Sequence, residues 1–200
     1  MKKAIKSLLC IFLCIGIIFS FAGCYGSTEM TEENVNAAVE TVEKALQEFD
    51  TKTLGKYVES ETLAYILNLA DGHEQFSQLG AAIFKDLNME VTAIDLEAKT
   101  VTVSVSNKDL YAIASGFTYE LMGKYSGFQL LRMLDNDAFL DISLADLTEK
   151  IDAAVASTDN IEITLSISQG KHNLVLGFDE DAEDAVSGGA LTAIKTAIGQ

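Results

Sequence analysis

Apolar residues recur at helical spacing through the first third of the chain, behind a continuous apolar run near the N-terminus. Thr31 is a good helix cap, and Glu32 and Glu33 follow it, where the positive end of a helix dipole favours acidic side chains. From there to Phe49 an apolar residue returns every three or four positions, which predicts one helix with a single buried stripe. The same spacing predicts three shorter helices, over residues 51–58, 63–70 and 76–87.

Two later stretches alternate apolar and polar residues instead. The first covers residues 91–106 and has a turn at 97–99, and the second covers residues 161–178 and has a turn at 169–171. A period of two is typical of a strand with one buried face, so each stretch predicts a β-hairpin.

Helical spacing returns between the two hairpins, over residues 108–157, with a break near Ser126 and Gly127. Within this insert, Ser143 and Asp146 resemble a capping box ahead of an apolar stripe that reaches Val155. A last helix is predicted over residues 190–198, after Gly188 and Gly189. Helices before, between and after two hairpins favour an α+β fold, with the N-terminal helices packed on an antiparallel sheet and a helical insert between its hairpins.

The N-terminal apolar run has a different meaning. It follows a short segment with three lysines and ends in small residues at 22–23, which is the pattern of a secretory signal peptide over residues 1–23. Seventeen residues, 7–23, are barely enough to span a bilayer, and no positive cluster follows them. Where this region ends, the residues Phe21-Ala22-Gly23-Cys24 resemble the lipobox of bacterial lipoproteins, with Phe21 where leucine is usual.

That resemblance implies that the chain is cut before Cys24 and that Cys24 receives a diacylglycerol. Residues 24–30 would then be a short tether, and residues 31–200 a single domain held at the extracytoplasmic face of the cell membrane. The other cysteines, Cys10 and Cys14, lie inside the apolar run. The exported domain is therefore expected to have no disulfide and no cysteine-based metal site.

Charge narrows the choice of partners. Removing the three lysines of the leader leaves 11 basic residues against 30 acidic ones, a formal charge of −19. Such a field repels nucleic acid and anionic lipid headgroups. The lipid on Cys24 is thus the expected membrane contact, and nucleic acid is not an expected partner.

A second resemblance concerns the domain. The segment Phe-Asp followed by Leu-Gly-Lys-Tyr-Val, within residues 49–58, and the acidic closing stretch of residues 174–191 resemble small clostridial-type lipoproteins with a nuclear-transport-factor-like cone domain. The resemblance implies a curved sheet capped by N-terminal helices, often with an apolar cavity between them. It implies no assigned activity.

Candidate chemistry is sparse, and no nucleophile elbow, dinucleotide loop or phosphate loop is present. His73 and His172 lack the spacing of metal ligands and are expected in exposed turns. The acidic run at 179–184 departs from a calcium loop at its sixth and twelfth positions and is expected to be the solvated start of a helix. No catalytic residue, metal or cofactor is therefore assigned.

Aromatic and methionine side chains crowd the insert and are the best candidates to line an adaptable pocket. They are Tyr111, Phe117, Tyr119, Met122 and Phe128. The expected function is a non-catalytic module that binds an unknown small molecule or protein. Two alternatives stay open, which are an enzyme of the cone fold acting on a small apolar or polyol substrate and a structural or envelope-assembly role.

Overall fold

Five strands form one mixed sheet in the computed structural model of the chain, which describes residues 27–133 and 136–198. In spatial order β1-β5-β4-β3-β2, they are β1 (Val58–Glu59), β5 (Leu174–Gly177), β4 (Ile161–Gln169), β3 (Thr100–Ser106) and β2 (Asn88–Asp95).

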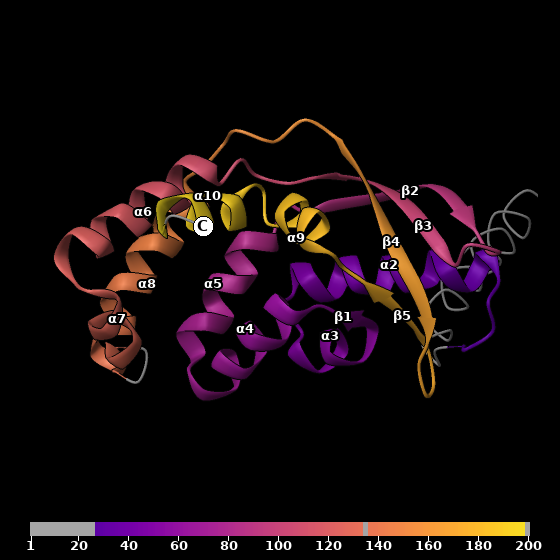
Figure 1. Cartoon of the computed structure of the whole chain (residues 1–200), viewed down its shortest axis with the longest axis horizontal. Helices are drawn as coiled ribbons and strands as arrows, with labels where there is room; N and C mark the ends of the chain where they lie inside the picture. Colours follow the sequence, from indigo (N-terminus) through magenta and orange to yellow (C-terminus); the bar gives the residue numbers. More distant parts are fainter. Residues whose placement is uncertain (1–26, 134–135, 199–200) are drawn as a thin grey trace, which may run out of the picture.

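Nine helices accompany the sheet in the described part of the chain (Figure 1). They are α2 (Glu32–Gln47), α3 (Thr51–Tyr57), α4 (Glu61–Gly72), α5 (Glu74–Phe84), α6 (Tyr111–Lys124), α7 (Gly127–Met133), α8 (Asp137–Asp152), α9 (Glu180–Val186) and α10 (Ala190–Ile198). The predicted α+β class is confirmed.

Both predicted hairpins are present, as β2–β3 and β4–β5, and β3 pairs antiparallel with β4. The regular alternation expected through 91–96 is interrupted, because Thr92 forms a bulge that moves the inward face from Val91 to Ile94. The pattern also missed β1, whose two residues pair parallel with β5 and make the sheet mixed rather than purely antiparallel.

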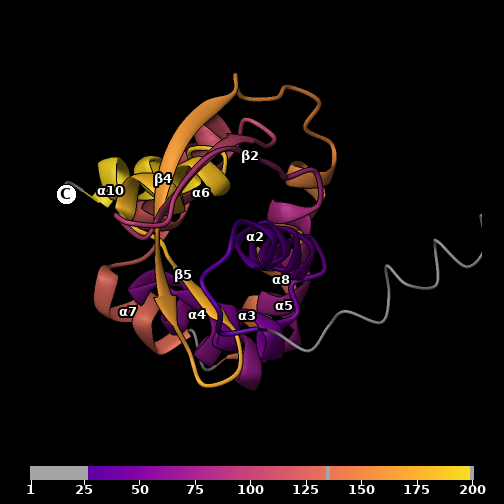
Figure 2. The same cartoon turned by 90° about the vertical axis from the view of Figure 1, so that its right-hand side faces the viewer.

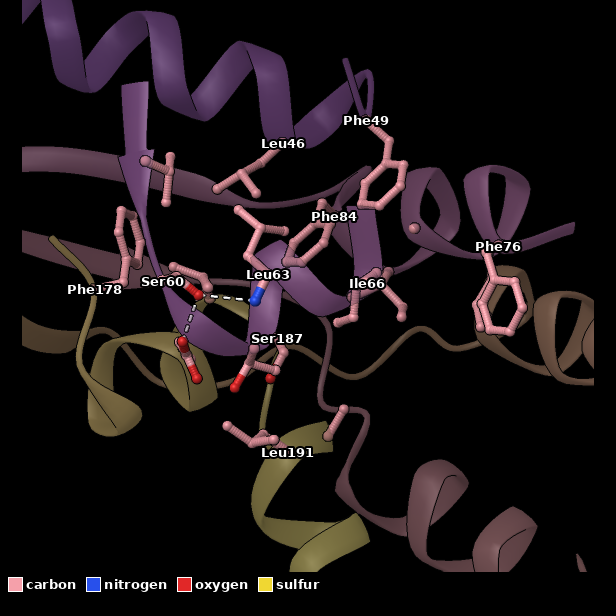
Figure 3. Close-up of a pocket in the computed structure, with 18 of the residues that line it drawn as sticks. Leu46, Phe49, Ser60, Leu63, Ile66, Phe76, Phe84, Phe178, Ser187 and Leu191 are labelled. Carbon is pink, nitrogen blue, oxygen red and sulfur yellow. Dashed lines mark hydrogen bonds between the residues drawn. The ribbon is translucent and has the colours of Figure 1, made fainter. Parts of the chain in front are cut away.

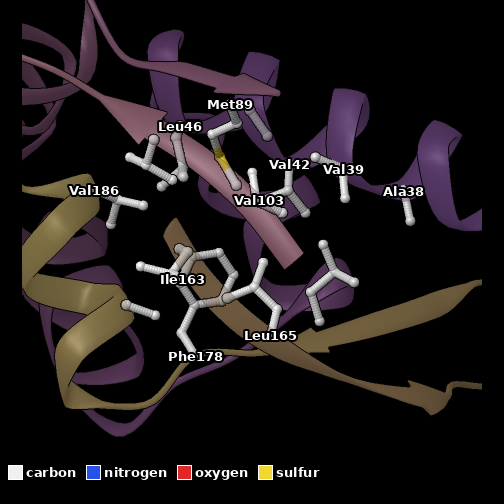
Figure 4. Packing of buried hydrophobic residues seen from close by; sticks show 14 of the residues in the cluster. Ala38, Val39, Val42, Leu46, Met89, Val103, Ile163, Leu165, Phe178 and Val186 are labelled. Atoms are coloured by element: carbon white, nitrogen blue, oxygen red, sulfur yellow. The ribbon is translucent and has the colours of Figure 1, made fainter. Parts of the chain in front are cut away.

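Helix α2 lies along the concave face of the sheet, and Figure 2 shows the strands arching around it. The hydroxyl of Thr31 accepts a hydrogen bond from the Asn34 backbone N–H at 3.2 Å, as expected of a capping residue. The buried stripe of α2, which includes Val39 and Val42, packs against Val103 and Leu165 of the central strands (Figure 4). This contact forms the main core.

The insert between β3 and β4 folds as α6, α7 and α8, with the break predicted near Ser126. The predicted capping box is wrong, because α8 begins at Asp137, six residues before Ser143, with Asn136 as its cap. The Asn136 side chain accepts from the Phe139 N–H at 3.2 Å. Val155 is also not part of the apolar stripe, since α8 ends at Asp152 and Val155 is 95% exposed.

Asn107 and Lys108 join this insert to the rest of the domain. The Asn107 amide donates to the carbonyls of Ile83 at 2.9 Å and Val186 at 2.7 Å. The Lys108 ammonium donates to the Ile151 carbonyl at 3.0 Å. These carbonyls belong to the last turns of α5, α9 and α8, so two buried polar residues satisfy the C-terminal ends of three helices.

Both buried clusters of the domain are built from residues between 35 and 193. The described residues therefore supply their own core, and we expect the domain to fold without residues 1–26. The described N-terminal end lies beside the β4–β5 turn, where Gln169 donates to the Thr28 carbonyl at 2.6 Å. The insert lies at the opposite end of the molecule (Figure 1).

Candidate functional site

A cavity of about 260 Å³ lies where the helices meet the short β1–β5 edge of the sheet. Helices α4 and α5 form one side, and α9 and α10 form the other. Its lining is almost entirely apolar, and Figure 3 shows the rings of Phe49 and Phe84 close together, with Phe178 and Phe76 to either side of them. The principal apolar side chains are Leu46, Phe49, Leu63, Ile66, Phe76, Phe84, Phe178 and Leu191.

Phe49 occupies an unusual position in this lining. It has a φ of 48°, in the left-handed region that glycine usually fills after a helix. The Phe49 N–H donates to the Leu46 carbonyl at 3.0 Å and the Asp50 N–H to the Ala45 carbonyl at 2.8 Å. These are the two hydrogen bonds that close the end of α2 in a Schellman motif. An aromatic residue there is strained by about 1–2 kcal/mol.

The ring of Phe49 is held by its neighbours. It is 5% exposed and stacks on Phe84 with the ring centroids 6.2 Å apart. A Cβ at Gly80, in the middle of α5, would lie 2.5 Å from the Phe49 ring. Glycine at position 80 is about 1 kcal/mol less favourable for the helix than alanine, but it leaves room for the Phe49 ring. Phe49 in the left-handed conformation and Gly80 inside a helix both depart from the conformational preference of their residue type, and both line the cavity. Such departures are typical of functional sites.

A polar pair, Ser60 and Glu183, joins the start of α4 to α9 at one end of the cavity. The Ser60 hydroxyl donates to Glu183 Oε1 at 2.5 Å and accepts from the Leu63 N–H at 2.9 Å, which caps the start of α4. Glu183 lies on α9 and is half-buried. Ser187, one turn later, also lines the cavity, and its hydroxyl donates to the Asp184 carbonyl at 3.0 Å. The cavity thus has a small polar end within an apolar body.

Resolved pKa shifts belong to surface pairs rather than to this cavity. The hydrogen bond from the Thr53 hydroxyl lowers the pKa of Asp50, the residue that caps α3. Hydrogen bonding and attraction to Lys124 lower the pKa of Glu120 on α6. Both carboxylates lie on exposed helical turns, and neither lines the cavity.

None of the aromatic and methionine residues predicted to bind a ligand lines the cavity. Tyr111, Tyr119, Met122 and Phe128 are exposed on α6 and α7, and Phe128 is 71% exposed. Phe117 is half-buried and packs against the smaller core cluster between α6, α8 and α10. Their role in binding stays a prediction, and the structure places them on a surface apart from the pocket.

The two histidines differ in their surroundings. His172 is exposed in the β4–β5 turn, as expected. His73 precedes α5 as expected, but its side chain is half-buried, with Nδ1 2.9 Å from Asp137 Oδ1 and the ring packed beside Phe76. Across residues 27–133 and 136–198, no group of three histidine, cysteine or acidic side chains is placed to hold a metal ion.

The acidic run at 179–184 is the start of a helix, as predicted. Asp179 caps α9, and its carboxylate accepts from the Ala182 N–H at 2.9 Å. Sequence reasoning missed that Glu183 turns from this run toward the cavity. It also missed Phe49, Ser60 and Gly80, although a glycine inside an apolar helical pattern is a recognisable signal.

The signal peptide and the lipobox, including Cys24, lie outside the described residues. Among the residues that are described, no helix is long and apolar enough to cross a membrane. Comparison with models of protein families, with curated protein sequences and with solved structures found no match for this chain.

Proposed function

We propose that this protein is a lipid-anchored extracytoplasmic lipoprotein whose domain binds a small, mainly apolar ligand in the cavity between α4, α5, α9 and α10. The observation that carries the proposal is the preformed pocket with one polar corner. Ligand sites are typically concave, apolar and fitted with a few fixed polar groups. At about 260 Å³, the cavity lies just below the range of roughly 300–1,000 Å³ for drug-sized ligands, so it suits a small molecule.

The lining favours binding over catalysis. Among the described residues that line the cavity, Glu183 is the one titratable side chain. General acid–base and nucleophilic mechanisms need a second group within hydrogen-bond reach of the reacting atoms, such as a base beside a nucleophile. Ser60 donates its proton to Glu183, but its hydroxyl also accepts the capping bond of α4, so it is committed to holding that helix.

Titration of a protein of residues 28–200 with n-hexanol tests the proposal. In methyl-resolved NMR spectra, we expect saturable shifts at Leu63 and Ile66 on α4 and at Ile83 on α5, because these side chains line the cavity. Ile194→Trp places a large ring at the cavity edge, where Ile194 is 42% exposed, and should abolish the shifts.

Ile142→Trp is the matched control, because Ile142 lies on α8, is 75% exposed and does not line the cavity. This variant should titrate like the parent protein. Shifts that instead gather at the methyl groups of Met122 and Leu131 on the exposed surface of α6 and α7, or that survive Ile194→Trp, would contradict binding in the cavity.

A further inference from the structure

The protons of the polar corner are already committed. The Ser60 hydroxyl gives its proton to Glu183, and the Ser187 hydroxyl gives its proton to the Asp184 carbonyl. What these two side chains still offer is oxygen lone pairs. The remaining carboxylate oxygen of Glu183 has no hydrogen-bond partner within the described residues. Among the described residues that line the cavity, Ser60, Ser187 and Glu183 therefore present acceptors, and the hydroxyl of Thr62 can still donate.

The corner also carries an uncompensated negative charge. Glu183 forms no ion pair with any lysine, arginine or histidine of the described segments. The closest cation in sequence on the facing helix, Lys195 of α10, pairs with Glu180 instead. The chain as a whole has a formal charge of −16, which raises the local concentration of cations and opposes anions.

From this arrangement we infer that the ligand of the cavity has an apolar body and a protonated amine as its head, and that Glu183 determines this specificity by accepting a charge-assisted hydrogen bond. The inference rests on the proposed function, since it names the chemical class that the cavity takes. A fatty acid or another anionic amphiphile would set a negative head against the Glu183 carboxylate without a cation to balance it.

Three probes that share one apolar body separate this inference from simple apolar binding. They are n-hexylamine, n-hexanol and hexanoate, each titrated calorimetrically into residues 28–200 at pH 7 and low ionic strength, where charge effects are least screened. We expect hexylamine to bind about tenfold more tightly than hexanol, because charge-assisted hydrogen bonds are roughly twice as strong as neutral ones. Hexanoate should bind more weakly than hexanol.

Glu183→Gln tests the residue itself. Glutamine keeps an oxygen that accepts the Ser60 proton, so the fold should survive, but the negative charge is lost. Hexylamine should then bind no more tightly than hexanol, while hexanol affinity should stay within about twofold of the parent. Asp181→Asn is the matched control, because it removes the same charge from the same helix at an exposed side chain that does not line the cavity, and it leaves Lys195 paired with Glu180. It should preserve the preference for the amine.

The outcomes distinguish the two proposals. If hexanol binds and hexylamine binds no better in the parent protein, the inference about the head group is wrong and the cavity site stands. Equal loss of the amine preference in Asp181→Asn and Glu183→Gln would assign the effect to net charge and would also overturn it. If none of the three probes binds, the proposed function fails as well.

Discussion

Phe49 adopts a backbone conformation that aromatic residues rarely take, and its surroundings explain how it is held there. The Schellman hydrogen bonds fix the turn after α2, and burial against Phe84 and Gly80 fixes the ring. The strain of about 1–2 kcal/mol is small beside the roughly 3–5 kcal/mol that a buried phenylalanine contributes relative to alanine. The fold therefore tolerates the strain, and the cavity gains an aromatic ring in its lining.

The strain at Phe49 predicts that glycine is less destabilising than alanine at this position, which is the reverse of the usual order in a helix. Both Phe49→Ala and Phe49→Gly should destabilise the domain by a few kcal/mol, because each leaves a void in the core. Phe49→Gly should nevertheless be about 1 kcal/mol more stable than Phe49→Ala, because glycine adopts the left-handed conformation without strain. Urea denaturation of residues 28–200 measures the difference.

Phe84, the stacked partner, is the control. It lies at the end of α5, in helical conformation, where glycine is less favourable than alanine by about 0.5–1 kcal/mol. The order of the two substitutions should thus be reversed there. The same order at both positions would contradict the claim that Phe49 is strained.

At the scale of elements, the helices are tied together at their ends. Asn107 and Lys108 bond the C-terminal carbonyls of α5, α8 and α9. The loop between α9 and α10 closes over them, where the Leu110 N–H donates to the Gly188 carbonyl at 2.9 Å. Since α5, α9 and α10 line the cavity, this junction sets the position of its walls.

Gly188 is the residue on which the junction should depend most. It has a φ of 61°, and a Cβ there would lie 1.9 Å from the Lys108 carbonyl oxygen. Because that obstacle is backbone, Gly188→Ala should destabilise the domain by more than about 3 kcal/mol. Gly189→Ala also strains the backbone, at a φ of 81°, but its Cβ would approach no atom closer than 3.4 Å. It should lose only about 1–2 kcal/mol in the same thermal or urea unfolding measurement.

At the scale of the whole molecule, the described N-terminal end and the insert lie far apart (Figure 1). A chain held at a membrane by Cys24 has few residues between its anchor and the start of α2 at Glu32. The seven residues between them, 25–31, span at most about 25 Å. The tethered end of the sheet would then lie near the bilayer, and the insert would extend away from it.

Lipidation predicts a clear result for Cys24→Ala. Cells that express the chain and are fed a labelled fatty acid should label the parent protein, and the variant should lose the label, because the thioether to the diacylglycerol needs this thiol. Cys14→Ala, within the apolar run, is the control and should be labelled normally. Label retained on the Cys24→Ala protein would show that the lipobox interpretation is wrong.

Local pattern was enough to predict most of the fold. Thr31 and the stripe behind it predicted α2, and the alternation at 161–167 predicted β4. These predictions succeeded because one buried face repeats at the period of the element itself. The start of α8 was mistaken because Ser143 and Asp146 imitate a capping box, whereas Asn136 caps the helix. Thr92 shifted the phase of β2 because a bulge depends on the pairing with β3.

The sequence by itself determined the helices, the two hairpins and the α+β class, since each follows from spacing between near neighbours. Tertiary structure alone decided the candidate site. Ser60 and Glu183 are 123 positions apart in sequence yet share a hydrogen bond, and Gly80 matters only because the Phe49 ring lies against it. The aromatic residues of the insert had the right composition for a pocket, but packing left them on the surface. Contacts between distant segments depend on how the elements pack, and they cannot be predicted from the hydrophobic period of any one element.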